Sequence, residues 1–131
     1  MLEVNIGMDL VFEASDQVGV LAKICKAFAK EGVNIQAVGA QTRGGKGFFT
    51  VLTDNNPKAL EALKKLNIDA KEREVVLLEL ENEIGALAEV SATLADTGIN
   101  ISSLYASAGE SYSSLIVLCC DDNAKAVAAL G

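Results

Sequence analysis

One segment of this chain occurs twice, and that repeat constrains the fold more than any other feature. Residues 16–38 align without gaps on residues 82–104, at an offset of 66. The matched positions include Gly19 with Gly85, Leu21 with Leu87, Gly32 with Gly98, and Asn34-Ile35 with Asn100-Ile101. After the next hairpin the offset becomes 67, which needs one residue added to a loop, where insertions cost little. The 131 residues therefore predict two copies of one small unit.

The first half of each copy predicts a strand followed by a helix. Apolar runs around residues 10–12 and 75–80 favour strands, and each run ends at a polar turn. A helical stripe follows, with apolar residues three or four positions apart: Leu21, Ile24, Cys25 and Phe28, then Leu87, Val90 and Leu94. Gly32 and Gly98 come just after these stripes, where a left-handed residue commonly ends a helix.

The second half of each copy predicts two strands and another helix. The strands cover residues 34–41 and 48–53 in the first copy, and 101–107 and 114–120 in the second. Glycines between them, Gly44 and Gly45 or Gly109, favour hairpins with positive φ. The second helix of the first copy begins at Asn56-Pro57, with Asn56 as its cap, and is expected to bury Leu60, Leu63 and Leu66.

The order strand–helix–strand–strand–helix–strand predicts an α+β fold. It consists of two tandem ferredoxin-like βαββαβ units, residues 1–66 and 67–131, with helices packed on one face of antiparallel sheets. Residues 68–73 would be the fourth strand of the first unit. The second unit has no such strand at its own end, but residues 2–6 occupy the equivalent position at an offset of 66. We hypothesise that residues 2–6 supply it, in the same chain or a partner; the alternative is a three-stranded second unit.

Two sequence motifs resemble those of the ACT domain family. Asp16-Gln17-Val18-Gly19-Val20-Leu21 with Gly32-Val33-Asn34-Ile35 forms the first match. Glu81-Asn82-Glu83-Ile84-Gly85-Ala86-Leu87 with Gly98-Ile99-Asn100-Ile101 forms the second. The family pattern often has Pro where this chain has Val18 and Ile84, and a polar residue where it has Ala14 and Leu80.

This resemblance implies a regulatory protein that binds an amino acid where paired units meet. It assigns the ligand to the loop before the first helix of each unit and to the Asn that precedes the next strand. The implied ligand-binding residues are Asp16, Gln17, Val18, Gly19, Val20, Leu21, Asn34 and Ile35, and then Asn82, Glu83, Ile84, Gly85, Ala86, Leu87, Asn100 and Ile101. It implies no cofactor, no metal and no catalytic residue.

The chemistry of these loops supports the same site independently. A helix start presents backbone N–H groups and the positive end of the helix dipole, which suit a carboxylate. Asn82 suits the carboxylate of a zwitterion, whereas Asp16 favours its ammonium group. The competing interpretation is local: Asp16 and Asn82 cap their helices, and Asn34 and Asn100 hold the start of a strand.

Charge and residue content exclude several other classes. The chain has 18 acidic and 11 basic residues, no His, and a net charge of −7, which argues against nucleic-acid binding. Residues 1–66 carry +1 and residues 67–131 carry −8. Without His, and without a Cys in an electropositive setting, we expect no enzyme. Glycines 44, 45 and 47 could form a phosphate-binding nest, but a tight hairpin explains them as well.

Cellular context and partners follow from the remaining features. Three cysteines, Cys25, Cys119 and Cys120, without a secretory signal indicate a reducing cytoplasm, with buried thiols favoured over a redox or metal site. No apolar stretch reaches the ~20 residues of a membrane span. Open sheet edges predict a homodimer. The alternative function is a ligand-free interaction and oligomerisation module that docks onto a metabolic enzyme.

Overall fold

The computed structural model describes Met1, residues 3–107 and residues 112–131. The chain divides into two compact units, Met8–Arg73, here unit A, and Met1–Gly7 with Glu74–Gly131, here unit B. Two long strands, β1 (Glu3–Ser15) and β4 (Ala70–Glu81), contribute residues to both units. The division into residues 1–66 and 67–131 follows the repeat in the sequence, and as a division into domains it stays a prediction.

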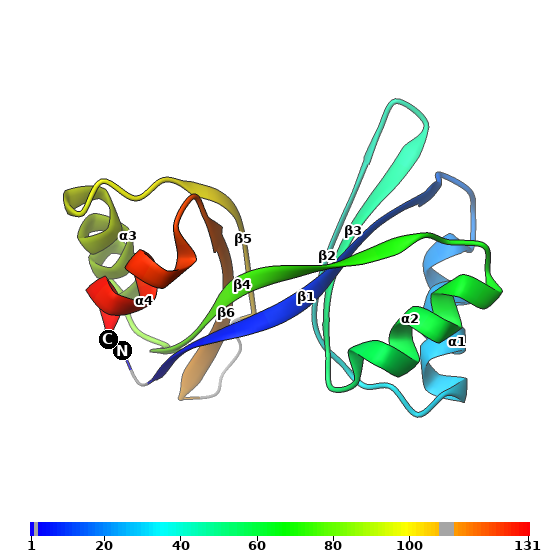
Figure 1. Ribbon diagram of the computed structural model, residues 1–131, viewed down its shortest axis with the longest axis horizontal. Coiled ribbons are helices and arrows are strands. Elements are labelled where there is room, and N and C mark those ends of the chain that lie inside the picture. Colours follow the sequence, from blue (N-terminus) through cyan, green and yellow to red (C-terminus); the bar gives the residue numbers. More distant parts are fainter. Residues whose placement is uncertain (2, 108–111) are drawn as a thin grey trace. The chain divides into compact units, whose positions relative to one another are not determined.

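In unit A, two helices lie on one face of an antiparallel sheet (Figure 1). Along the chain its remaining elements are α1 (Val20–Lys30), β2 (Ile35–Arg43), β3 (Lys46–Thr53) and α2 (Asn56–Lys65). The strand order is β2-β3-β1-β4, so β2 ends the sheet on one side of the unit. In the register, Val51 of β3 lies opposite Leu10 of β1 and Val38 of β2.

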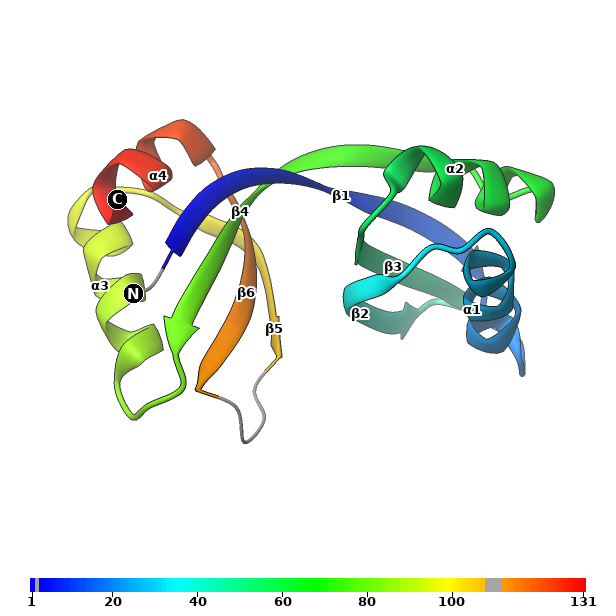
Figure 2. The ribbon, with the colours of Figure 1, turned by 90° about the horizontal axis from the view of Figure 1, so that it is seen from below.

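Unit B repeats this arrangement, with its helices again on one face of the strands (Figure 2). Its elements are α3 (Ala86–Asp96), β5 (Ile101–Ser107), β6 (Ser113–Cys120) and α4 (Asn123–Leu130), and its strand order is β1-β4-β6-β5. Leu118 of β6 lies opposite Val76 of β4 and Leu104 of β5. The predicted fold of two ferredoxin-like units is therefore confirmed.

Each unit has its own hydrophobic core between sheet and helices. In unit A, Leu10, Phe28 and Leu63 are fully buried, and the rings of Phe12 and Phe49 stack with their centroids 5.1 Å apart. In unit B, the buried core includes Val76, Leu94 and Leu118. Full burial of such side chains contributes roughly 1.5–3 kcal/mol each, so the two small cores stabilise their own units.

Fewer residues of each apolar helical stripe are buried than the stripe contains. Ile24 and Phe28 of α1 are buried, as are Val90 and Leu94 of α3. Leu21 and Leu87 belong to the apolar stripes, yet their side chains are 47% and 42% exposed. Both residues lie in the first helical turn, ahead of the buried row. In α2, Leu63 is buried, whereas Leu60 and Leu66 are only half-buried.

The helix ends and turns largely follow their residue types. Gly32 and Gly98 have φ of 73° and 77°, which confirms the left-handed residues after α1 and α3. The hairpin glycines Gly44 and Gly45 also have positive φ, whereas Gly109 lies outside the described residues. The cap of α2 is one residue earlier than predicted: the side chain of Asn55 accepts a hydrogen bond from the Lys58 amide at 3.1 Å.

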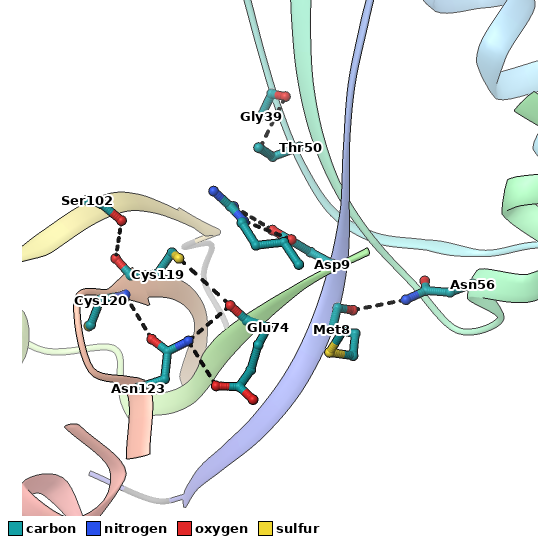
Figure 3. Close-up of polar contacts among 11 residues, drawn as sticks. Met8, Asp9, Gly39, Thr50, Asn56, Glu74, Ser102, Cys119, Cys120 and Asn123 are labelled. Carbon is teal, nitrogen blue, oxygen red and sulfur yellow. Dashed lines mark hydrogen bonds and ion pairs between the residues drawn. The ribbon is translucent and has the colours of Figure 1, made fainter. Parts of the chain in front are cut away.

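A repeated side-chain contact joins the second helix of each unit to its sheet (Figure 3). The Asn56 amide Nδ2 donates to the Met8 carbonyl at 3.1 Å, and the Asn123 Nδ2 donates to the Glu74 carbonyl at 3.0 Å. These asparagines are equivalent at an offset of 67, and their acceptors at an offset of 66. The shared contact fixes the same helix position in both copies.

Candidate functional site

The predicted site centres on two pre-helix loops, residues 16–19 before α1 and residues 82–85 before α3. Both loops end in a glycine with φ of 88°, Gly19 and Gly85. That left-handed conformation is readily adopted only by glycine, which explains why both copies carry it. The preceding apolar residues, Val18 and Ile84, are fully exposed at 108% and 105%. The loops therefore have the same conformation and present the same apolar side chain to the surface.

The helices that follow these loops start without a side-chain cap. Gly19 and Gly85 are themselves the N-cap residues of α1 and α3, and neither helix start receives a side-chain cap hydrogen bond. The N-cap residue of α1 and α3 is therefore a glycine, three residues after Asp16 and Asn82 respectively. By contrast, Asn55 caps α2 and Asp122 caps α4, the latter by accepting from the Lys125 amide at 3.0 Å.

These uncapped helix starts are where an anion would be stabilised. The first-turn N–H groups of a helix have no partner within the helix, and the helix dipole adds roughly half a positive charge there. No acidic residue lies in the first turn of α1, and Glu89 lies in the first turn of α3. The first turn is thus less acidic in α1 than in α3, whereas the loop before α1 carries Asp16 where the loop before α3 carries Asn82.

The backbone of each pre-helix loop is bound to the hairpin of its own unit. The Asp16 amide donates to the Gly45 carbonyl at 3.2 Å, and the Asn82 amide donates to the Tyr112 carbonyl at 2.8 Å. The side chains of Asp16, Gln17, Asn82 and Glu83 are exposed. The loops are therefore held at their first residue and present their polar side chains at the surface.

Asn34 and Asn100 occupy a second fixed position, at the start of the next strand. The Asn34 amide donates to the Asp54 carboxylate at 2.9 Å, and its carbonyl accepts from the Asp54 amide at 3.1 Å. Asn100 and Asp121 repeat both bonds, at 3.2 and 3.0 Å. These bonds use the backbone of each Asn, so the exposed side-chain amides remain oriented toward the surface. Sequence reasoning missed Asp54 and Asp121 here, although they align at an offset of 67.

Within one unit, the two parts of the predicted site lie at opposite ends of a helix. The loop at residues 16–19 precedes α1, and Asn34 follows it. Because α1 has 11 residues, at 1.5 Å per residue its ends are about 16 Å apart. The same separation applies to residues 82–85 and Asn100 across α3. A small ligand therefore does not reach the loop and the Asn of one unit at the same time.

The apolar residues of the predicted site fall into two groups. Val20, Ile35, Ala86 and Ile101 are half-buried against the cores of their own units. Leu21 and Leu87 are instead half-exposed, and so are Val38 and Leu104 on the edge strands, which sequence reasoning did not include. The sequence indicates these four residues only as apolar residues that occupy the same positions in both copies.

The part of the chain that the structure describes also bears on metal ligation, thiol chemistry and membrane insertion. No group of three His, Cys, Asp or Glu side chains there could hold a metal ion. Cys120 is buried, and burial raises the pKa of its thiol. No described helix is both long and apolar enough to span a membrane.

The fold and these loops define a class of small α+β units that occur in pairs along a chain. The ACT domain family model matches residues 8–70 and again residues 75–130. The chain therefore belongs to the ACT domain family, with two domains in tandem.

Several solved structures share the whole fold. A protein from Bacteroides thetaiotaomicron has a TM-score of 0.89 and 24% identity, over 97% of this chain and 88% of that one. The regulatory subunit of aspartate kinase from Thermus thermophilus has a TM-score of 0.68 and 18% identity, over 96% and 95%. The corresponding subunit from Thermus flavus has a TM-score of 0.63 and 21% identity, over 97% and 94%. No curated protein matches this chain.

Proposed function

We propose that this protein is a non-catalytic regulatory protein of the cytoplasm that binds a free amino acid. The ligand lies where the pre-helix loop of one ACT unit meets a paired unit in a homodimer. The observation that carries the proposal is a contrast between helices: α2 and α4 have side-chain caps, whereas α1 and α3 do not. The Val20 and Ala86 amides donate to the Gln17 and Glu83 carbonyls, so an external carboxylate would bind at the following amides of the first turn, in the same way in both copies.

The groups around this position suit an α-amino acid. The α-carboxylate would accept from the first-turn amides of α1 or α3. The positive φ of Gly19 and Gly85 lets a ligand approach the backbone closely. Asn34 and Asn100 supply an amide that can both donate and accept, and Asp16 can accept from an ammonium group. Asp16 corresponds to Asn82, so the two sites differ in charge and would differ in affinity.

The relatives support a regulatory role. Two of the structures with this fold are regulatory subunits of aspartate kinase, and one further structure contains the α and β subunits of aspartokinase. By analogy, this chain would change the activity of a metabolic enzyme through a shift between conformations or association states. A ligand can drive such a shift only if it binds one state more tightly than the other.

A second candidate function is a ligand-free interaction module. The observation in its favour is the full exposure of Val18 and Ile84, since exposed apolar side chains at matched positions also suit a protein partner. In that case the module would dock onto a metabolic enzyme. Amino acid binding is the preferred proposal because a protein contact alone would not require both helix starts to be uncapped.

A thermal-shift screen against the twenty common amino acids separates the two functions. At 100 times its dissociation constant, a ligand adds about 2.7 kcal/mol to the free energy of unfolding. We expect at least one amino acid to raise the melting temperature, and Asn34→Ala with Asn100→Ala to abolish the shift. Asn5→Ala, an exposed Asn outside both loops, is the matched control. No shift with any amino acid contradicts the proposal and favours the interaction module.

A further inference from the structure

Exposed apolar side chains occur at matched positions in the two units. Of the ten large hydrophobic residues exposed in the described part of the chain, six form three equivalent pairs. The pairs, with exposed fractions, are Val18 and Ile84 (108% and 105%), Leu21 and Leu87 (47% and 42%), and Val38 and Leu104 (48% and 40%). Single exposed apolar residues need no explanation, but a set that two divergent copies both keep exposed indicates a surface that is covered by a partner.

The helix surface beside these residues is built from small side chains. In α1, Ala22, Cys25 and Ala29 follow Leu21 at helical spacing, and the equivalent residues of α3 are Ala88, Ser91 and Ala95. All are exposed except Cys25, which is half-buried. Small residues allow another helix to approach closely. We define docking face A as Val18, Leu21, Ala22, Cys25, Ala29 and Val38, and docking face B as Ile84, Leu87, Ala88, Ser91, Ala95 and Leu104.

Each docking face borders a strand that ends the strand order of its unit. These strands are β2 in unit A and β5 in unit B. A strand in that position has backbone N–H and C=O groups along one side that are not used within its own sheet. An apolar face beside such an edge suits a second ACT unit, because strand pairing and helix packing can then form together.

The two units carry very different charges. Unit A has ten Lys and Arg against eight Asp and Glu, a net charge of +2, whereas unit B has one against ten, a net charge of −9. The difference extends to the helices that carry the docking faces. Helix α1 has Lys23, Lys26 and Lys30 and no acidic residue, and α3 has Glu89 and Asp96 and no basic residue. Lys23 is equivalent to Glu89, and Lys30 to Asp96, and all five side chains are exposed.

We propose that two copies of this chain form a twofold dimer in which docking face A of each protomer packs on docking face B of its partner. Pairing of like units would bring two surfaces of unit B, each of net charge −9, against one another. Pairing of unlike units matches the same apolar residues and brings opposite charges together. This inference rests on the proposed function in one respect, since it identifies which units combine to form each ligand site.

The proposed pairing fixes the composition of each site. Antiparallel packing of α1 on the partner's α3 brings the start of one helix to the end of the other. Residues 16–19 then lie next to the partner's Asn100, and residues 82–85 next to the partner's Asn34. Each dimer contains two copies of both composite sites, one with Asp16 and one with Asn82. Pairing of like units would instead combine Asp16 with the partner's Asn34.

Charge reversal tests the pairing by sedimentation equilibrium of the full chain without ligand. The first variant carries Lys23→Glu, Lys26→Glu and Lys30→Glu, and the second carries Glu89→Lys and Asp96→Lys. We expect each variant alone to raise the dimer dissociation constant by about tenfold or more, and their combination to restore it. A control, Lys58→Glu with Lys64→Glu on exposed positions of α2, should leave the constant unchanged.

The salt dependence of the dimer dissociation constant is a second test, made on the unmodified protein. Attraction between unlike units is screened by ions, so the dissociation constant should rise between 0.05 and 0.5 M NaCl, concentrations that shorten the Debye length from roughly 14 to about 4 Å. Pairing of like units would give the opposite trend, because screening would relieve repulsion between the acidic units. A dissociation constant that falls with salt, reversals that do not compensate, or a monomer at every concentration would overturn the proposal.

Cross-linking tests the same pairing through geometry rather than charge. Cys25 of face A is equivalent to Ser91 of face B. In a chain with the partly exposed Cys119 changed to Ser, Ser91→Cys and a short bis-maleimide should give a covalent dimer, and adding Cys25→Ser should abolish it. A covalent dimer that persists after Cys25→Ser would indicate pairing of face B with face B and overturn the inference. Because no amino acid is present in these experiments, a failed thermal-shift screen would reject the ligand while leaving the pairing intact.

Discussion

At the level of single residues, the clearest departure from the repeat is a buried ion pair in unit A. The Arg73 guanidinium donates to both carboxylate oxygens of Asp9, from Nη2 at 2.7 Å and from Nε at 3.1 Å (Figure 3). Asp9 is fully buried. At an offset of 66, its equivalent in unit B is Val75, and that of Arg73 is Gly7. The pair therefore distinguishes unit A from unit B at the same position of the fold.

Removing Arg73 should strongly destabilise the protein. Arg73→Met leaves the Asp9 carboxylate buried without its cation, which typically costs 3–5 kcal/mol, or roughly 4 kcal/mol here. Replacing both residues, as in Asp9→Leu with Arg73→Met, should recover most of that loss, because the buried charge is then absent. Urea denaturation measures both variants against Arg43→Met, whose exposed guanidinium lies 4.5 Å from the Phe48 ring centre. Equal losses for Arg73→Met and Arg43→Met would contradict the prediction.

Repetition explains which residues the sequence could predict. Residues shared by both copies, such as Gly19 with Gly85 and Asn34 with Asn100, stand out in the alignment of the two halves. The Asp9–Arg73 pair does not, because only one copy has it. The exposure of Leu21 and Leu87 was not predictable either: helical spacing indicates which residues share a face, not how far along the helix that face is covered.

At the level of elements, β1 and β4 are longer than the repeat predicts. The pattern indicated strands at residues 2–6 and 10–12, and a strand at 68–73 that runs into the next one at 75–80. In the structure β1 extends without a break over Glu3–Ser15 and β4 over Ala70–Glu81. Apolar patterning reports the part of a strand that faces a core. It does not report the stretch that joins two such parts, so the continuity of β1 through residues 7–9 was not predicted.

Removing the first seven residues should damage unit B more than unit A. Residues 3–7 form the first part of β1 and belong to unit B, where Val4 packs against the core. A chain that starts at Met8 loses this strand, and the free energy of unfolding of unit B should fall by at least about 1 kcal/mol. Full burial of a Val contributes roughly 1.5–3 kcal/mol, and Val4 is half-buried. Urea unfolding followed by amide exchange of β6 and, as internal control, of β3 measures the difference. Full stability of the shortened chain would contradict this assignment.

At the level of the whole molecule, duplication followed by divergence kept the fold and changed the surface. Both units retain the uncapped helix starts, the docking faces and the Asn before the second strand. Their charges have diverged to +2 and −9. The sequence alone showed this asymmetry, but not its consequence, because the docking faces become visible only when exposed and buried apolar residues can be told apart.

Paired substitutions show which residues share a ligand site, because the number of sites that remain depends on which units pair. If unlike units pair, Asp16 and the partner's Asn100 share one site, so Asp16→Ala with Asn100→Ala destroys that site and leaves the other, formed by residues 82–85 and the partner's Asn34. Calorimetric titration with an amino acid from the thermal-shift screen should then give half the sites of the unmodified protein. Asp16→Ala with Asn34→Ala is the matched control, and it should remove all binding because it damages both composite sites. If like units pair instead, the two results exchange: the control keeps half the sites and the first variant keeps none.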